Sequence, residues 1–344
     1  MACYYPMEAV RFYDGTVKVT GASASDFHSA KYKDLVKEFL QVPCGKCIGC
    51  RLEYSRQWAI RCMKELETCE GPAYFLTLTY DNEHLPRKTF EEDASGVRVS
   101  MPELRPRDLQ LFVKRLCEKL RRKGVENFRF FACGEYGDEL KRPHYHMIAY
   151  NLPLDDLEFY KSIRGHEYYN SKFLDECWEN QGFVVASDVN FECCAYVARY
   201  VMKKATGPNG FSYASDNNIC DEFTRMSRRP GIGKAYYDLH KDEIYGHVEY
   251  DPQLQKAVRV GAKDNIGYMP TINGPILLKP AKYYDKLYDV EYDMQDLKEK
   301  RADKAQRISM MKMSQTTVSS IDYRRICEED KQSKIALLKR SIDI

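Results

Sequence analysis

The chain has 344 residues, of which 30% are charged and 12% are aromatic, a composition typical of a globular protein and not of a disordered or fibrous one. Its formal net charge is only +2, so a nucleic-acid-binding surface must come from local clusters of basic residues. The sequence shows no secretory signal pattern and no run of roughly 18 apolar residues, so we expect a cytoplasmic protein without a membrane contact.

The first forty residues carry no strong periodic pattern, and a cysteine-rich stretch, PCGKCIGC, follows them. Cys44, Cys47 and Cys50 are three apart, and Cys62 lies twelve residues further along a segment that favours a helix. Thiolates at such spacing suit zinc or, less often, an iron–sulfur cluster. Two interpretations stay open: a structural Zn²⁺ with Cys62 as candidate fourth ligand, and reduced thiols that pack in the core.

Residues 73–80, AYFLTLTY, are aromatic and β-branched and predict a buried strand, and we interpret the polar residues 81–100 as a loop. Helical periodicity of apolar residues then runs from Arg105 to Lys123 and stops at Gly124. This segment holds eight Lys or Arg against two acids, mostly opposite its apolar stripe. It is a candidate DNA-backbone surface, with Lys114, Arg115, Arg121 and Arg122 as the contact residues.

Two strands, FRFFACGEYG and HYHMIAY, are expected on either side of a polar turn. In the second, His144 and His146 project to the same face, because side chains two apart in a strand share a face. A hairpin can bring Glu135 beside the two imidazoles. Two histidines and a carboxylate would hold a divalent ion and leave positions open for water or a phosphate oxygen. The alternative is a pair of packed histidines.

The segment AYVARYVMKK predicts a helix on which Tyr196 and Tyr200, four residues apart, share one face. Lys203 falls on that face as well, and Lys204 lies beside it. Because the chain has 26 tyrosines, ordinary packing is the competing interpretation.

Strands and helices alternate irregularly around a central hairpin, which favours an α+β fold with a central antiparallel sheet flanked by helices. We expect three regions: residues 1–70 with the cysteine cluster, a core over 71–210, and a partly helical C-terminal extension over 211–344. Charged, helix-permissive segments occupy 291–312 and 322–341 of that extension.

The strand FLTLTY, the element PHYHMIAY and the helical Tyr-x3-Tyr-x2-Lys-Lys resemble, in this order, the HUH endonucleases that initiate rolling-circle replication. A closer resemblance is to the replication initiation proteins of small single-stranded DNA bacteriophages, the Microviridae of the gokushovirus type. The stretches PCGKCIGCRLEYSRQWAIR, GEYGDELKRPHYH and MSRRPGIGKAYY carry it. The resemblance spans roughly residues 40–240.

The resemblance implies an HUH-like fold in which His144 and His146, with Glu135 as a less certain third ligand, hold Mg²⁺ or Mn²⁺. It implies that Tyr196 and Tyr200 are nucleophiles and that Lys203 and Lys204 are basic catalytic residues. The expected activity nicks the viral origin, supplied as single-stranded DNA or supercoiled duplex, through a 5′-phosphotyrosine intermediate. The free 3′-hydroxyl serves a host polymerase, and the displaced strand is rejoined into a circle.

A host helicase is the expected partner for melting, because the stretch GIGK lacks the first glycine of a nucleotide-binding P-loop: position 228 is Arg. The expected location is the cytoplasm of the bacterial host. Two functions from other classes compete with the nickase. One is a non-catalytic, zinc-dependent nucleic-acid-binding protein with the cysteine cluster at its centre. The other is a metal-dependent phosphodiesterase that uses water, in which the tyrosines are inert.

Overall fold

The computed structural model describes residues 3–21, 27, 32, 34–92, 97–137, 140–163, 165–200, 217–269 and 274–336. The chain divides into two compact units. One unit comprises the residues up to Tyr54 together with those from Leu297 onward, and the other comprises Ser55–Asp296. Neither boundary coincides with the regions expected from the sequence, and that three-part division stays a prediction.

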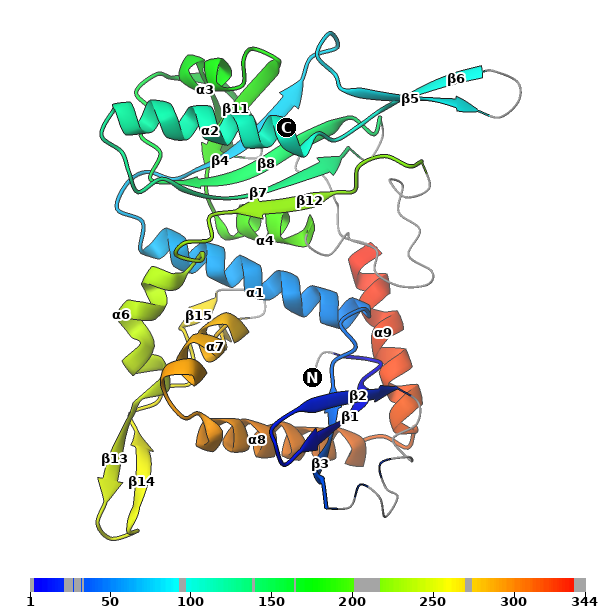
Figure 1. The fold of residues 1–344 in the computed structure, drawn as a ribbon, viewed down its shortest axis with the longest axis vertical. Coiled ribbons are helices and arrows are strands. Elements are labelled where there is room, and N and C mark those ends of the chain that lie inside the picture. Colours follow the sequence, from blue (N-terminus) through cyan, green and yellow to red (C-terminus); the bar gives the residue numbers. More distant parts are fainter. Residues whose placement is uncertain are drawn as a thin grey trace. The chain divides into compact units, whose positions relative to one another are not determined.

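A seven-stranded sheet forms the centre of the larger unit (Figure 1). Its strand order is β12-β7-β8-β4-β11-β10-β9, and every neighbouring pair is antiparallel. The predicted α+β class with a central antiparallel sheet is therefore confirmed. The strands are β4 (Tyr74–Tyr80), β7 (Arg129–Tyr136), β8 (Pro143–Tyr150), β9 (Leu157–Ile163), β10 (His166–Ser171), β11 (Gly182–Asp188) and β12 (Phe223–Met226).

Each face of this sheet packs against different helices, because side chains alternate between faces along a strand (Figure 1). Tyr145, Met147 and Ala149 of β8 lie in one cluster with the apolar stripe of α2 (Pro106–Arg122) and with α3 (Lys172–Cys177). Ile148 and Tyr150 lie in a second cluster with α4 (Phe191–Tyr200) and with residues of α1 (Ile48–Glu67). The predicted helix at residues 105–123 is confirmed as α2, which buries Leu109, Phe112, Leu116 and Leu120.

The structure corrects the sequence interpretation of two segments. Residues 81–100, expected as a loop, contain most of a hairpin of β5 (Arg87–Glu92) and β6 (Val97–Pro102). Its strands mix charged and β-branched residues, which hides the alternation of a half-buried strand. The unpatterned N-terminal region forms a three-stranded sheet of order β2-β1-β3, with β1 (Met7–Phe12), β2 (Val17–Gly21) and β3 (Val36–Val42).

Tyrosines pack together in the later part of the larger unit. The rings of Tyr245 and Tyr288, from α6 (Lys234–Tyr245) and α7 (Lys282–Glu291), stack at 4.3 Å. Many of the chain's 26 tyrosines thus serve packing. The remaining strands are β13 (His247–Asp251), β14 (Lys256–Val260), β15 (Tyr268–Met269) and β16 (Ile276–Leu277). The two charged segments near the C-terminus form α8 (Gln295–Ser314) and α9 (Ser320–Ala336), which confirms the predicted helices there.

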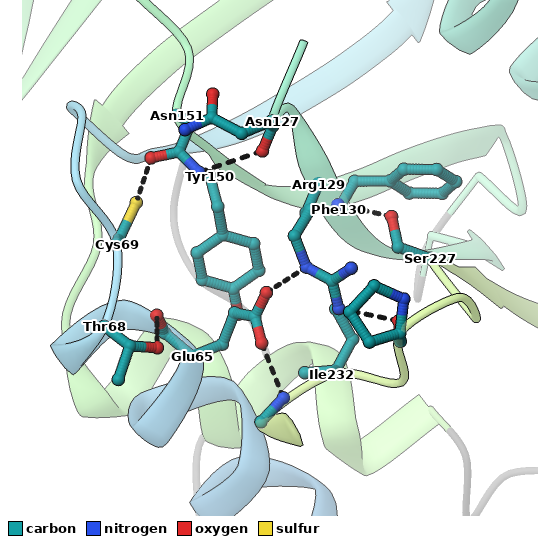
Figure 2. Close-up of polar contacts among 12 residues, drawn as sticks. Glu65, Thr68, Cys69, Asn127, Arg129, Phe130, Tyr150, Asn151, Ser227 and Ile232 are labelled. Atoms are coloured by element: carbon teal, nitrogen blue, oxygen red, sulfur yellow. Dashed lines mark hydrogen bonds and ion pairs between the residues drawn. The ribbon is translucent and has the colours of Figure 1, made fainter. Parts of the chain in front are cut away.

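A buried ion pair joins α1, β7 and the segment before α6 (Figure 2). Glu65 accepts hydrogen bonds from Arg129 Nε and, at 2.6 Å, from the backbone N–H of Gly233. Arg129 also donates to the carbonyl of Pro230 at 2.9 Å. Both side chains are largely buried, so each charge depends on the other for its compensation.

The Glu65→Gln variant is expected to lower the free energy of unfolding by about 3 kcal/mol or more, because it leaves the guanidinium of Arg129 buried without a countercharge. The matched control is Glu67→Gln on the same helix, where an exposed pair with Lys64 contributes about 1 kcal/mol or less. Chemical denaturation followed by circular dichroism measures both variants. Equal denaturation midpoints for the two would contradict the expectation.

Candidate metal and nucleophile site

The hairpin of β7 and β8 brings Glu135 against both histidines. In the antiparallel register Glu135 pairs with His144 and Cys133 pairs with His146, and the two histidines share the face that packs against α4. Glu135 Oε1 lies 2.6 Å from His144 Nε2 and 3.0 Å from His146 Nε2. Glu135 and His146 are buried, and His144 is one-fifth exposed. The site is thus open to solvent at His144.

The other nitrogen of each imidazole is held by a neighbouring polar atom. His144 Nδ1 lies 3.1 Å from the carbonyl of Arg142, and His146 Nδ1 lies 3.0 Å from the hydroxyl of Thr77 on β4. A carbonyl only accepts, so His144 Nδ1 donates to it and the neutral ring carries a lone pair on Nε2. This lone pair faces a carboxylate oxygen, an arrangement that needs a second proton on the imidazole or a cation between the two atoms.

The carboxylate of Glu135 is held as an anion. Burial opposes its ionisation, but hydrogen bonds with His144 and His146 outweigh that effect and lower its pKa to about 2. Its second oxygen, Oε2, is buried and has no hydrogen-bond partner among the described residues. The two imidazole nitrogens and the carboxylate oxygen all lie within 4.8 Å of one another. This donor set, with its unpartnered oxygen, fits a divalent cation that keeps positions open for other ligands.

Tyr196 of α4 belongs to the same group of side chains. Its hydroxyl donates to Glu135 Oε1 at 2.9 Å, and its ring meets that of His146 edge-on at 5.0 Å. Phe75 lies against both, stacked on His146 and edge-on to Tyr196. The helix that carries Tyr196 packs on the histidine face of the sheet, so the phenol oxygen points at the carboxylate and not into the apolar core.

Three predicted catalytic residues have side chains outside the described part of the chain. Tyr200 is the last residue of α4, one helical turn beyond Tyr196, and only its backbone is described. Lys203 and Lys204 lie wholly outside the described residues. Their roles stay predictions.

The three predicted cysteine ligands come together, but with a different fourth thiol. The Sγ atoms of Cys44, Cys47, Cys50 and Cys3 all lie within 4.8 Å of one another. Cys62, the candidate fourth ligand in the sequence, follows Cys50 by twelve residues along the continuous helix α1, which corresponds to about 18 Å. It packs against Phe75 and Tyr150, and burial raises the pKa of its thiol to about 12. Cys62 therefore belongs to the core, and Cys3 replaces it in the group.

The basic helix α2 lies on the opposite face of the sheet from the histidines. Several of its cations already have acidic partners: Arg115 pairs with Glu179, and Arg122 pairs with Glu118. Lys114 and Arg121 are exposed, and neither forms an ion pair within the described residues. The predicted DNA surface is thus reduced to two accessible cations and is separated from the histidine site by the sheet.

Sequence reasoning missed Thr77 and Cys3. Thr77 has a weak signal, since it is a polar residue at a buried position of an otherwise apolar strand. Cys3 has none, because its proximity to the other thiols depends on how β1 pairs with β3.

A family model described as replication-associated protein ORF2 matches residues 73–205, the range that contains both histidines, Glu135 and Tyr196. The replication-associated protein ORF2 of Spiroplasma virus 4 is 30% identical over 331 residues, which cover 94% of this chain and 92% of that protein. The chain belongs to this replication-associated protein family. Its predicted resemblance to replication proteins of small phages of the Microviridae is thereby confirmed.

Two further members of the family match over shorter stretches. The replication-associated protein VP4 of Bdellovibrio phage phiMH2K is 34% identical over 208 residues, 59% of each chain. The replication-associated protein ORF4 of Chlamydia phage 1 is 29% identical over 202 residues, 57% of this chain and 46% of that protein. No solved structure matches the chain. Within the described residues, no helix combines the length and the apolar character needed to cross a membrane.

Proposed function

We propose that the protein initiates rolling-circle replication as a site- and strand-specific DNA endonuclease of the HUH type, with its activity in residues 71–210. The observation that carries the proposal is the convergence of His144, His146 and the Tyr196 hydroxyl on the carboxylate of Glu135. Family membership supports the role in replication. The strand order and the antiparallel hairpin that bears the histidines are compatible with the HUH fold.

The proposed reaction is a transesterification by tyrosine. The phenol oxygen of Tyr196 or Tyr200 attacks the scissile phosphorus, a Tyr–O–P bond forms, and the bond from phosphorus to the 3′-oxygen breaks. The phenol loses its proton, and the 3′-oxygen gains one from solvent. One phosphodiester replaces another, so the bond is conserved for later rejoining of the strand.

His144, His146 and Glu135 would hold the divalent ion, Mg²⁺ or Mn²⁺, which when bound would polarise the phosphate and stabilise its developing charge. Thr77 and the Arg142 carbonyl orient the imidazoles toward that position. Lys203 and Lys204, which follow α4, are proposed to steady the phosphate or the phenolate.

The substrate is proposed to be origin DNA in single-stranded form, because a paired and stacked strand cannot enter between a sheet and a helix. Melting is assigned to supercoiling or a host helicase, and extension from the 3′-hydroxyl to a host polymerase. These partners place the protein in the cytoplasm of the bacterial host.

A denaturing gel tests the proposal. The full chain is incubated with a labelled single-stranded origin oligonucleotide and Mg²⁺ or Mn²⁺. A label that migrates with the protein under denaturing conditions is the expected result. Cleavage without a linked band would instead indicate a hydrolase that uses water, and binding without cleavage would indicate a non-catalytic binder.

Lys114 and Arg121 are proposed to contact the DNA backbone away from the cutting site. Replacing both with alanine is expected to weaken DNA binding uniformly across sequences and to lower the slope of log affinity against log salt by about 1.4, the value for two single-strand phosphate contacts. The nicking rate at saturating DNA should not change, because α2 lies across the sheet from the histidines. Fluorescence anisotropy over a salt series measures the slope, with the exposed Lys263→Ala as control. An unchanged slope would remove these two residues from the interface.

A further inference from the structure

The four-cysteine group lies in the smaller unit and joins two segments that are distant in sequence. Cys3 precedes β1, Cys44 and Cys47 follow β3, and Cys50 lies in the first turn of α1. In the antiparallel pair of β1 and β3, Met7 is opposite Val42. The residues before β1 and those after β3 therefore leave the sheet at the same end, which brings Cys3 to the other three thiols.

The sulfur spacing fits a single metal ion. Cys47 Sγ lies 3.9 Å from Cys3 Sγ, and all four sulfurs fall within 4.8 Å of one another. Tetrahedral zinc with Zn–S bonds of about 2.3 Å places its sulfurs about 3.8 Å apart. The ligands of a multi-iron cluster bind separate iron atoms and stand farther apart. A disulfide would need about 2.05 Å, and all four cysteines are free.

Backbone N–H groups surround these sulfurs. The N–H of Cys44 donates to Cys3 Sγ at 3.3 Å, that of Cys47 to Cys44 Sγ at 3.3 Å, and that of Tyr4 to Cys47 Sγ at 3.4 Å. Gly45 adopts a left-handed conformation with φ of 74°, which lets the chain turn tightly between Cys44 and Cys47. The N-terminus of α1 adds its partial positive charge beside Cys47 and Cys50. These groups would offset the charge of four thiolates.

We propose that Cys3, Cys44, Cys47 and Cys50 bind one structural Zn²⁺ that ties the N-terminal end of the chain to the start of α1. Four protein ligands complete the tetrahedral shell, so the site has no open position for a substrate. The proposal does not rest on the endonuclease activity, which uses other residues. It assigns the fourth ligand to Cys3.

The test measures metal in purified, reduced full-length protein and in the His144→Ala/His146→Ala variant, so that metal bound at the histidines is not counted. About one zinc per chain is expected in that variant by the structural-site rule. Cys3→Ser in the same background is expected to weaken zinc retention against a chelator at least tenfold. Cys117→Ser, on α2 and outside the group, is the matched control and should retain the zinc.

A measurement on the unaltered ligands covers the case in which Cys3→Ser does not fold. Zinc-edge X-ray absorption of the His144→Ala/His146→Ala variant should show four sulfurs at about 2.3 Å. Three sulfurs with one nitrogen or oxygen would overturn the role of Cys3. A folded protein without metal, or one that contains iron and sulfide, would overturn the zinc site altogether. Unaltered nicking by a zinc-free protein would leave the endonuclease proposal standing while the zinc proposal fails.

Discussion

Replacing His146 with alanine is expected to lower the rate of origin cleavage on the order of a thousandfold while the protein stays folded. His146 is buried and directs Nε2 at Glu135 Oε1, so the variant loses one of three convergent ligands. A divalent ion in such a site contributes several kcal/mol of transition-state stabilisation, and each 1.36 kcal/mol corresponds to about tenfold in rate. Single-turnover cleavage of an origin oligonucleotide at saturating Mn²⁺ measures the effect. His144→Ala should give a loss of similar size.

The matched control is His84→Ala, which removes an exposed imidazole whose polar contact within the described residues is with Asp81, in a loop of the same unit. Its cleavage rate should equal that of the unaltered chain. DNA binding without metal should persist in all three variants, because phosphate contacts elsewhere supply most of the affinity. Full cleavage by the His144→Ala/His146→Ala double variant would exclude these residues as the metal site.

Removal of the Tyr196 hydroxyl is expected to abolish covalent attachment at that residue and to leave the adduct formed by Tyr200. The Phe variant keeps the ring contacts with His146 and Phe75 and deletes only the oxygen that donates to Glu135. The two tyrosines are one helical turn apart, so either can reach one phosphate as nucleophiles that alternate between cutting and rejoining. Each single Tyr→Phe variant should therefore form adduct, and the double variant none.

Mass spectrometry of the nuclease-trimmed adduct identifies the linked tyrosine in each variant. Tyr145→Phe is a suitable control, because that buried hydroxyl bonds with Tyr80 on the other face of the sheet. The alternating scheme fails if one single variant forms no adduct and the other completes cutting and rejoining at the original rate. In that case one tyrosine serves packing alone.

Local patterns were sufficient to predict the elements that build the site. The alternation of His144 and His146, the carboxylate before a short turn, and the apolar stripe of α2 each depend on neighbours in sequence. Cys3 depends instead on a strand pairing across more than thirty residues, which no local pattern encodes. The basic face of α2 was visible in the sequence, but its position across the sheet from the histidines follows from which alternate residues of β8 face which helix.

The strict alternation along β8 makes the site sensitive to parity. Inserting one residue between Pro143 and His144, while Pro143 keeps its pairing with Tyr136, would send both imidazoles into the α2 cluster and the apolar side chains toward α4. Inserting two residues would restore the facing of every side chain and shift only the partner across the ladder. In related chains, length changes inside this strand should therefore come in even steps, whereas the turn before it can vary by any number.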